Sequence, residues 1–508
     1  MGIALLSIGK PFIPQANDLL PFAGDFILVL TIVSVLIAPF FSRKSNASAG
    51  AVTLVGLIAA LASVCAVGVP TDLVGFHFRG TLLFDPFSVG FKIILLIFVI
   101  GIVVMRLGTG FKRLHTGDGP EFFCLLLGAT LGLSLMSSTT HLLMIFMTIE
   151  LASFASYVLA GFRKTDRLGA EASLKYVLFG AASSGVMLYG LSMLFGLLGT
   201  LQLDQVARSI HQADALTWVA VLAILVGVGF KIASVPFHFW CPDVFEGASV
   251  EVTAFLSVAS KSAALILAYR LVTLISGTLV PASTLATLLS TAAICTMTLG
   301  NTAAIAQVNM KRLLAYSSIA HAGYMLCVLV LAGREHAGTS LLFYIAVYAV
   351  MNLGAFMVVS VVEDGLAMRA KTRERATFSG ATLSDFAGLA RRSPVLAGSM
   401  FICLLSLVGL PPVAGFFAKL NLLLDLARVD RWVLLIALVV NTVVSLYVYL
   451  RVARAMYLTP DATGDVPPKA SSAGQLLAAV CAVALIAMFA MYDRLWGALD
   501  AFGSLLKP

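Results

Sequence analysis

Long apolar runs, separated by short polar segments, set the pattern of this 508-residue chain. A transmembrane helix needs about 20 mostly apolar residues, and runs of this kind recur along nearly the whole sequence. The pattern predicts an all-α polytopic membrane protein with about fourteen transmembrane helices. The predicted spans are residues 19–41, 50–68, 86–107, 120–137, 140–161, 169–198, 216–237, 250–275, 281–304, 312–332, 339–362, 394–427, 431–457 and 473–492.

Two apolar segments are interrupted by proline. The interruptions lie at Pro411 and Pro412 within residues 394–427, and at Pro236 and Pro242 within residues 216–248. A helix broken in lipid needs protein or water around its freed backbone groups. Broken helices in corresponding halves of a membrane protein indicate a transporter of two inverted repeats, with the functional site at the breaks.

The two breaks lie about five spans apart, so spans 4–8 and 9–13 are predicted to form inverted five-helix repeats. This spacing divides the chain into four parts. They are an N-terminal three-span segment (1–119), a first antiporter-like repeat (120–275), a second repeat (276–457) and a C-terminal span (458–508).

Composition excludes a soluble fold. Hydrophobic residues make up 60% of the chain and charged residues 11%, whereas soluble domains carry about 25% charged residues. The net charge of +8 is attributed to cytoplasmic loops and not to nucleic-acid binding. The seven cysteines form no CxxC pair, so we expect no metal, cluster or other cofactor in this chain.

Basic residues alternate between predicted loops. If the N-terminus lies outside, Lys and Arg concentrate on the cytoplasmic face and both termini are periplasmic. The predicted cytoplasmic residues are Arg43, Lys44, Arg106, Lys112, Arg113, Arg163, Lys164, Arg167, Lys311, Arg312, Arg369, Lys371, Arg373, Arg375, Arg391, Arg392, Arg451, Arg454 and Lys469. The loop 238–249 departs from this trend because it carries Asp243 and Glu246.

Four ionisable residues fall deep inside predicted spans: Glu150, Lys231, Lys261 and Lys419. A charge at that depth is costly and indicates function by default. A buried lysine can hold or release a proton as neighbouring charges change, whereas transported metal cations want oxygen ligands. We therefore predict a relay that carries H⁺. The structural alternatives are a carboxyl paired for helix packing and lysines that cap carbonyls freed at a break.

Weaker candidates lie around this group. Lys175 is about one turn inside its span and shares a helix face with Glu171, but its side chain could also reach the interface. His321 and His238 could relay protons or be satisfied within packing. Three other charges are expected to be structural and near the membrane edges: Asp25, Lys92 and Arg270.

Several ordered motifs resemble those of the antiporter-like membrane subunits of respiratory complex I, the NADH-quinone oxidoreductase. They are residues 231–248, with Pro236, His238, Trp240 and Pro242, residues 252–257, residues 309–318, and Pro411-Pro412 followed by Gly415-Phe416. The likeness covers about residues 120–457. The chain looks most similar to the subunit N group, because Asn352 lies where relatives L and M usually carry histidine, Lys419 where M usually has glutamate, and no long lateral helix follows.

The resemblance implies a proton-translocating unit of the membrane arm in a bacterial inner membrane. Glu150 and Lys231 would interact, Lys261 would be the central relay, Lys419 would face the periplasmic exit and Lys175 the intake side. NADH, FMN, iron–sulfur clusters and quinone would bind to other subunits. Partners would be subunit M on one side, small membrane subunits on the other, and lipids. One departure stands out, since Ser249 and Glu251 replace two prolines usual in the family.

Three other readings remain open. A subunit of a multi-subunit cation/proton antiporter shares these motifs. A non-pumping scaffold of the membrane arm is a second alternative, although a scaffold has no need of buried lysines. A channel fits poorly, because a row of lysines repels permeant cations.

Overall fold

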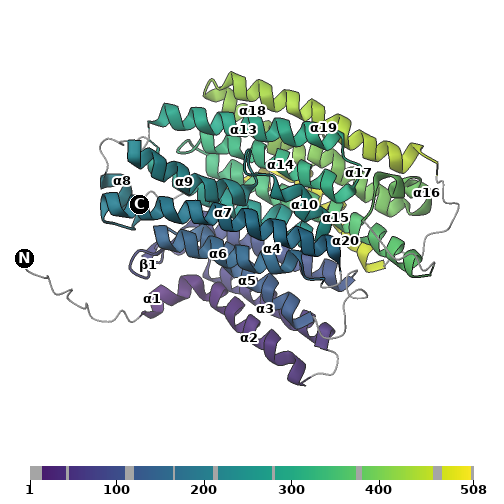
Figure 1. The fold of residues 1–508 in the computed structure, drawn as a ribbon, viewed down its shortest axis with the longest axis horizontal. Helices are drawn as coiled ribbons and strands as arrows, with labels where there is room; N and C mark the ends of the chain where they lie inside the picture. The colour runs from purple at the N-terminus through teal and green to yellow at the C-terminus, as the bar shows by residue number, and fades with distance from the viewer. Residues whose placement is uncertain are drawn as a thin grey trace, which may run out of the picture.

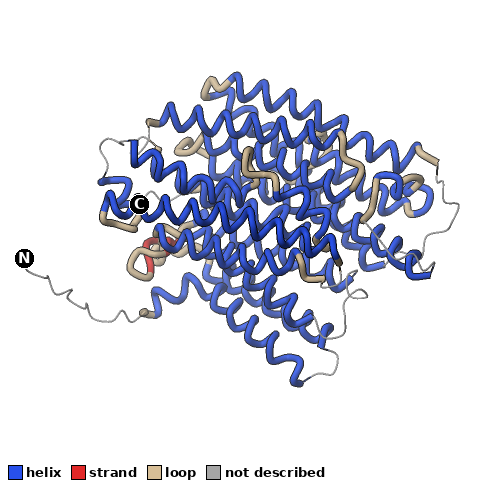
Figure 2. Tube along the Cα trace, viewed as in Figure 1, coloured by secondary structure: helices blue, strands red, loops and turns tan. Residues whose placement is uncertain are grey.

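The computed structural model of the chain is built almost entirely of helices (Figures 1 and 2). The structure describes residues 14–41, 45–108, 119–163, 166–209, 215–276, 281–372, 380–460 and 472–504. Thirteen helices in these ranges are long and apolar enough to cross a membrane. This confirms the prediction of an all-α polytopic membrane protein.

The N-terminal part holds three long helices and a small hairpin. Pro86 and the residues before it lead from the hairpin directly into the third helix. The elements are α1 (Ala16–Leu19), a 3₁₀ turn (Leu20–Phe22), α2 (Ala23–Phe41), α3 (Ser45–Val67), β1 (Gly75–His77), β2 (Leu82–Phe84) and α4 (Pro86–Gly108). The strands pair antiparallel, with Phe76 opposite Leu83.

The middle part contains the first broken helix. Its elements are α5 (Gly119–Ser138), α6 (Leu142–Ala160), α7 (Arg167–Leu198), α8 (Leu203–Ser209), α9 (Ala215–Ile232), α10 (Trp240–Gly247), α11 (Val250–Phe255), a π-helical turn (Leu256–Ser260) and α12 (Lys261–Ile275). The break separates α9 from α10, where Pro236 was expected to interrupt the helix.

The last part contains the second broken helix. Its elements are α13 (Ala282–Ile305), α14 (Met310–Val330), α15 (Ala337–Thr372), a 3₁₀ turn (Leu383–Phe386), α16 (Leu389–Arg392), α17 (Pro394–Val408), α18 (Gly415–Arg428), α19 (Trp432–Leu458), α20 (Ser472–Ala490) and α21 (Tyr492–Asp500). The predicted span 394–427 is thus two short helices, α17 and α18. Neither alone is long enough to count among the thirteen candidates.

The broken helices surround a closely packed centre. In the span formed by α11 and α12, residues Val250–Ile275, every side chain except Thr273 and Leu274 is buried within the protein. Next to it, α14 lies so close to α13 that a Cβ on Gly300 or Gly323 would meet backbone atoms of the partner helix. Small residues at such contacts allow membrane helices to approach closely. The packing fixes the position of α14, which carries part of the site.

One end of the bundle holds both ends of the described chain. In α1, Asp18 lies 3.5 Å from the His77 ring of the hairpin, and Phe502 after α21 packs against Gly90 in α4. Figure 1 shows β1 and α8 at this end and α16 at the opposite end. The shared position agrees with the prediction that both termini lie on one side. Which side that is stays a prediction.

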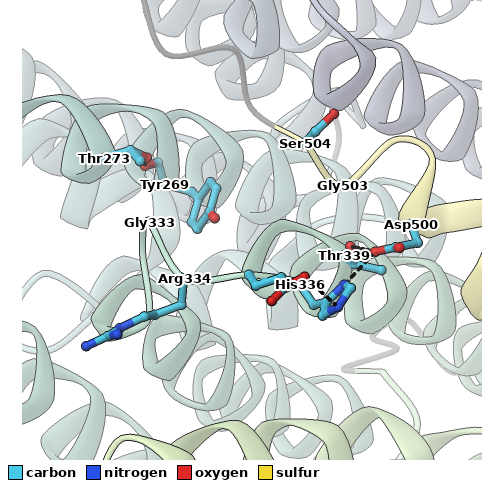
Figure 3. A pocket seen from close by; sticks show the side chains of 10 residues that line it. Tyr269, Thr273, Gly333, Arg334, His336, Thr339, Asp500, Gly503 and Ser504 are labelled. Atoms are coloured by element: carbon cyan, nitrogen blue, oxygen red, sulfur yellow. Dashed lines mark hydrogen bonds and ion pairs between the residues drawn. The ribbon is translucent and has the colours of Figure 1, made fainter.

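A pocket of about 300 Å³ opens at the same end (Figure 3). It lies between the end of α12, the turn that joins α14 to α15, and the residues around Asp500. The Asp500 carboxylate accepts hydrogen bonds from the Thr339 hydroxyl at 2.7 Å and bonds the His336 ring at 2.8 Å. These contacts attach the C-terminal helix to the turn before α15.

The opposite end is the basic one. Described basic residues that the sequence assigned to one side lie there together, among them Arg106 and Arg163 around a small pocket near Gly247. The remaining residues of that prediction lie outside the described ranges or have undescribed side chains: Arg43, Lys44, Lys112, Arg113, Lys164, Arg369, Lys371, Arg373, Arg375 and Lys469. Which membrane face this end occupies stays a prediction.

The sequence suggested that Arg270 anchors the protein at a membrane edge, but its side chain is buried inside the protein. Its side chain is 1% exposed and binds the equally buried Asp85 through two bonds of 3.0 Å. It also donates to the Ser137 carbonyl at 2.8 Å. The apolar neighbours of Arg270 in sequence gave no sign of Asp85, which lies 185 residues earlier.

Asp25 and Lys92 are likewise buried inside the protein. The Lys92 ammonium donates to the Asp25 carboxylate at 2.6 Å, and the Ser134 hydroxyl donates to the other carboxylate oxygen. The pair joins α2, α4 and α5. Their structural role, which the sequence suggested, fits this arrangement, and their position near a membrane edge stays a prediction.

Candidate proton-relay site

The first break places Lys231 in the interior. Lys231 lies in the last turn of α9, and the chain then turns at Ala233, whose φ is +60°. The side chain is fully buried, and its ammonium donates to the Ser153 hydroxyl of α6 at 2.9 Å. No carboxylate of the described residues pairs directly with it. A buried ammonium held only by a neutral hydroxyl can lose its proton without leaving an unpaired anion.

Glu150 lies one turn before Ser153 on the same face of α6. Its carboxylate accepts a hydrogen bond from the Ser184 hydroxyl of α7. Within the described residues no ion pair joins Glu150 to Lys231, and the nearest link between them is Ser153, which binds Lys231. The structure therefore brings the two residues to one region, with Ser153 between them, which is close to the interacting pair that the family resemblance implied.

Lys261 begins α12, directly after the π-helical turn Leu256–Ser260. Such turns occur frequently at functional sites, because they shift a side chain out of regular helical register. The buried ammonium donates to the Ser318 hydroxyl of α14 at 2.5 Å and to the Cys241 sulfur at 3.4 Å. It also lies 5.4 Å from the ring centre of Phe245. This environment likewise lacks a carboxylate among the described residues.

Lys419 lies in α18, just past the second break. Its ammonium donates to the carbonyls of Leu407 at 3.1 Å and Val408 at 2.8 Å, the last residues of α17. It also lies 4.5 Å from the ring centre of Tyr324. This is the capping arrangement that the sequence raised as a structural alternative. It does not exclude proton exchange, because carbonyls are neutral and the charge of Lys419 stays uncompensated.

His321 connects Lys261 with Lys419 through α14. Ser318, which binds Lys261, lies one turn before His321, and Tyr324, which faces Lys419, lies one turn after it. The His321 ring shares a hydrogen bond of 2.9 Å with the Tyr344 hydroxyl and packs edge-on against Tyr324. The structure thus gives His321 a central place that its sequence context left open.

His238 lies in the break between α9 and α10 and is 5% exposed. Its ring packs on Phe239, with the ring centres 4.4 Å apart. Within the described residues, Nδ1 has no hydrogen-bond partner. A buried ring nitrogen without a protein partner is suited to bind water, so His238 remains a candidate next to the lysines.

Lys175 lies apart from the buried row. Its ammonium is 2.8 Å from both Glu171 and Asp243, and its side chain is 38% exposed. Arg312 of α14 binds the same Asp243 at 2.7 Å and also Glu246 at 2.8 Å. The pairing of Glu171 with Lys175 agrees with their spacing. The sequence gave no hint that Asp243 and Glu246, which had appeared to break the charge trend, are neutralised by these cations.

Glu251 is buried as well. Its carboxylate forms an ion pair with Arg106 of α4, and the Arg106 guanidinium lies 4.2 Å from the ring centre of Phe122. Ser249, at the other position where the family usually has proline, precedes α11 in an extended conformation with φ −65° and ψ 152°. That φ is close to the value of proline, so the backbone at Ser249 would accept the proline usual in the family.

Other polar groups of the site could not be found from sequence. Ser153, Ser184, Ser318, Cys241 and Tyr344 are ordinary residues of apolar runs, and only the fold brings them to the ionisable groups. Among the described residues no group of three or more His, Cys, Asp or Glu could hold a metal ion. The polar groups of the site are the lysine amines, several hydroxyls, the Cys241 thiol, the imidazoles of His238 and His321, and the Glu150 carboxylate.

Comparison with known proteins identifies the lineage of this arrangement. Residues 139–445, which contain Glu150, both breaks and all three buried lysines, match the family described as NADH:quinone oxidoreductase/Mrp antiporter, transmembrane. The chain belongs to this family. Its members among curated proteins include the NAD(P)H-quinone oxidoreductase subunit 2 of Gloeobacter violaceus, which is 38% identical over 434 residues, 85% of this chain and 81% of the relative.

A second relative of the NADH:quinone oxidoreductase/Mrp antiporter family is the NADH-quinone oxidoreductase subunit N of an Anaeromyxobacter species. It is 37% identical over 470 residues, 87% of either chain. Among solved structures, a chain of respiratory complex I from Thermus thermophilus matches with a TM-score of 0.77 and 31% identity, over 94% of this chain and 99% of that one. A chain of the Mrp complex from a Dietzia species shares the fold, with a TM-score of 0.79 at 20% identity, over 95% and 97%.

Proposed function

We propose that this protein is a proton-translocating membrane-arm subunit of an NADH-quinone oxidoreductase of the subunit N type. The observation that carries the proposal is the buried row Lys231, Lys261 and Lys419, in which every ammonium is held by neutral groups. An ion pair would fix each charge in place. Neutral partners instead leave each lysine able to change its protonation state when a neighbouring charge moves.

The arrangement suggests a role for each residue. Glu150 is the charged neighbour that biases Lys231 across Ser153. Lys261 is the central carrier, and His321 with Tyr344 joins it to Lys419 at the second break. Because the sites act on one another, they titrate as a coupled set.

Outside the buried row, Lys175 with Glu171 lies at the basic end, where protons would enter from the cytoplasm. His238, with its unpaired nitrogen, offers a place for water near Lys231.

In this proposal electron transfer takes place elsewhere in the complex. NADH, FMN, iron–sulfur clusters and quinone bind to other subunits, and their redox cycle changes the charge that Glu150 experiences. The chain resides in a bacterial inner membrane with both termini periplasmic. A subunit of the M type contacts one side and small membrane subunits contact the other.

The test replaces Lys261 with Met in the assembled enzyme and measures NADH-driven quinone reduction together with proton uptake in vesicles. Met approximates the length of lysine but cannot carry a proton. We expect both rates to fall together while the complex stays assembled. The matched control is Cys481→Ala, a buried change on α20, a helix that carries none of the relay residues. Unchanged rates in the Lys261→Met enzyme would leave the non-pumping scaffold as the better description.

The second candidate function is that of a subunit in a cation/proton antiporter, which the family description also covers. A transported metal cation would need several oxygen ligands, and the described row instead presents ammonium groups. Vesicles containing the enzyme separate the two functions. A sodium gradient that drives proton movement without NADH would favour the antiporter, whereas strict dependence on NADH oxidation supports the proposal made here.

A further inference from the structure

A groove of about 590 Å³ lies on the outer surface of the bundle between α17 and α19. Its walls are largely apolar, and all but one of its residues come from the last three turns of α19. It is lined by Phe401, Tyr447, Leu450, Arg451, Ala453, Arg454, Tyr457 and Leu458. Phe401 closes it from the α17 side, with its ring edge-on to Tyr457 at 5.8 Å between centres. The groove therefore sits at the basic end, where α17 begins and α19 ends.

Two arginines give this groove a positive charge that no carboxylate of the described residues matches. Arg451 donates to the backbone carbonyls of Ile305 and Gln307, which leave its charge uncompensated. Arg454 is exposed, and none of the described side chains forms an ion pair with it. Within the ranges that the structure describes, no acidic residue lines the groove. A ligand with a negative head group would meet two cations one turn apart.

The apolar part of the groove continues along α19 away from the arginines. Leu450, Val443, Ile436 and Val433 are all about half exposed or more, and they recur at seven- and three-residue intervals that keep them near one face. At 1.5 Å per residue, the distance from Val433 to Leu450 is roughly 25 Å, close to the thickness of a bilayer's hydrocarbon core. A hydrocarbon chain lying on this face would find apolar contact over its whole length.

We propose that the groove between α17 and α19 binds an acidic phospholipid, with its phosphate on Arg454 and Arg451 and its acyl chains along α19. The charge selects the head group, and the tyrosines at the rim suit the membrane interface, where aromatic side chains with one polar end gather. Basic pockets between transmembrane helices at the cytoplasmic side are a known way to hold anionic lipids. The site is separate from the proton relay, because its lining shares no residue with it.

A lipid fits this groove better than a helix of another subunit. A partner helix would need a long complementary face and two carboxylates of its own, one turn apart, to match the arginines. A phospholipid supplies its negative charge at the interface and its apolar part in the membrane. The occupant is therefore expected to be a bilayer component that stays with the protein during purification.

The experiment uses the assembled enzyme in phosphatidylcholine nanodiscs that contain a small fraction of photoreactive lipid, either phosphatidylglycerol or phosphatidylcholine. After illumination, labelled peptides of α17 and α19 are counted by mass spectrometry. We expect phosphatidylglycerol to label the groove several-fold more than phosphatidylcholine. Arg454→Gln should lower that labelling about fivefold, the usual effect of one arginine near an anionic surface, and Arg454→Lys should retain it.

The matched control is Arg334→Gln, which removes an exposed arginine beside the pocket at the opposite end of the bundle and should leave α19 labelling unchanged. Equal labelling by the two lipids, or by wild type and Arg454→Gln, would show only ordinary boundary lipid and overturn the proposal. So would suppression by soluble glycerol 3-phosphate, or cross-links from the groove to another subunit without lipid. Because Arg454 is exposed, its loss should not affect folding, and thermal unfolding of the variant checks this.

Discussion

Replacing Lys231 with Met should keep or raise the stability of the protein but lower its activity. The lysine is fully buried, and its only hydrogen-bond partner among the described residues is the Ser153 hydroxyl. Methionine fills nearly the same volume and removes a buried charge. Exchange of buried charged groups for well-packed apolar ones is often neutral or stabilising by about 1–4 kcal/mol. The small loss on the other side is one hydrogen bond, about 1 kcal/mol, because the Ser153 hydroxyl keeps its bond to the Ile149 carbonyl. The protein should therefore be as stable as wild type or more so.

The effect on coupled turnover should be large. If Lys231 carries a proton between Glu150 and Lys261, its removal interrupts the row and the cycle stalls. We expect NADH-driven quinone reduction and proton pumping to fall at least tenfold, equivalent to an added barrier of about 1.4 kcal/mol. Both rates are measured on the purified enzyme in vesicles, with assembly checked by subunit composition and thermal unfolding.

The control for Lys231→Met is Lys92→Met, a buried lysine in a different setting. Lys92 neutralises Asp25 at 2.6 Å, so its loss leaves a buried carboxylate without a cation and should destabilise the protein by about 3–5 kcal/mol. Two buried lysines thus give opposite stability changes for one substitution. A Lys231→Met enzyme that unfolds as readily as Lys92→Met, or that pumps at the wild-type rate, would refute the reasoning.

Two further changes test other parts of the structure. Arg270→Met should lower thermal stability in detergent by about 3–5 kcal/mol, because it strands the fully buried Asp85 carboxylate; retained stability would contradict that pairing. The hydrogen bond from the Thr339 hydroxyl, followed by the bond to His336, holds the pKa of Asp500 below its ordinary value. The stability that the Asp500 carboxylate adds is therefore present above about pH 4 and is lost as the pH falls below it. Because Asp500 is partly exposed, this stability should amount to less than about 1 kcal/mol. The protection of α21 from hydrogen exchange in Asp500→Asn at pH 7 should resemble the protection in wild type at low pH.

The fold can be predicted well from the sequence, because each helix that spans a bilayer needs about 20 mostly apolar residues. Apolar length sets the spans, and proline positions gave both breaks, including the fact that residues 394–427 form two short helices. The division into repeats follows from those breaks and stays a prediction. The π-helical turn before Lys261 could not be foreseen, since residues 256–260 fit a regular helix equally well.

The candidate site is predictable in part. Buried charges stand out against apolar neighbours, and this identified Glu150, Lys231, Lys261 and Lys419. Their partners depend on which helices meet, which sequence spacing within one helix cannot show. Arg270 was misplaced for that reason, because its partner Asp85 comes from another segment of the chain. Lys175 was expected on the intake side, and the sequence could not show that Asp243 binds it at the basic end.

The long-range ion pairs of the interior bear on how the protein is made. Asp85 is synthesised 185 residues before Arg270, and Arg106 precedes Glu251 by a similar interval. At about 5–20 residues per second, the earlier member of each pair waits roughly ten seconds or more for its counter-ion. During that time α4 carries unneutralised charge at both of its ends, which the insertion machinery or a chaperone must shelter. The ion pairs at the two ends of α4 are therefore completed only when α11 and α12 arrive.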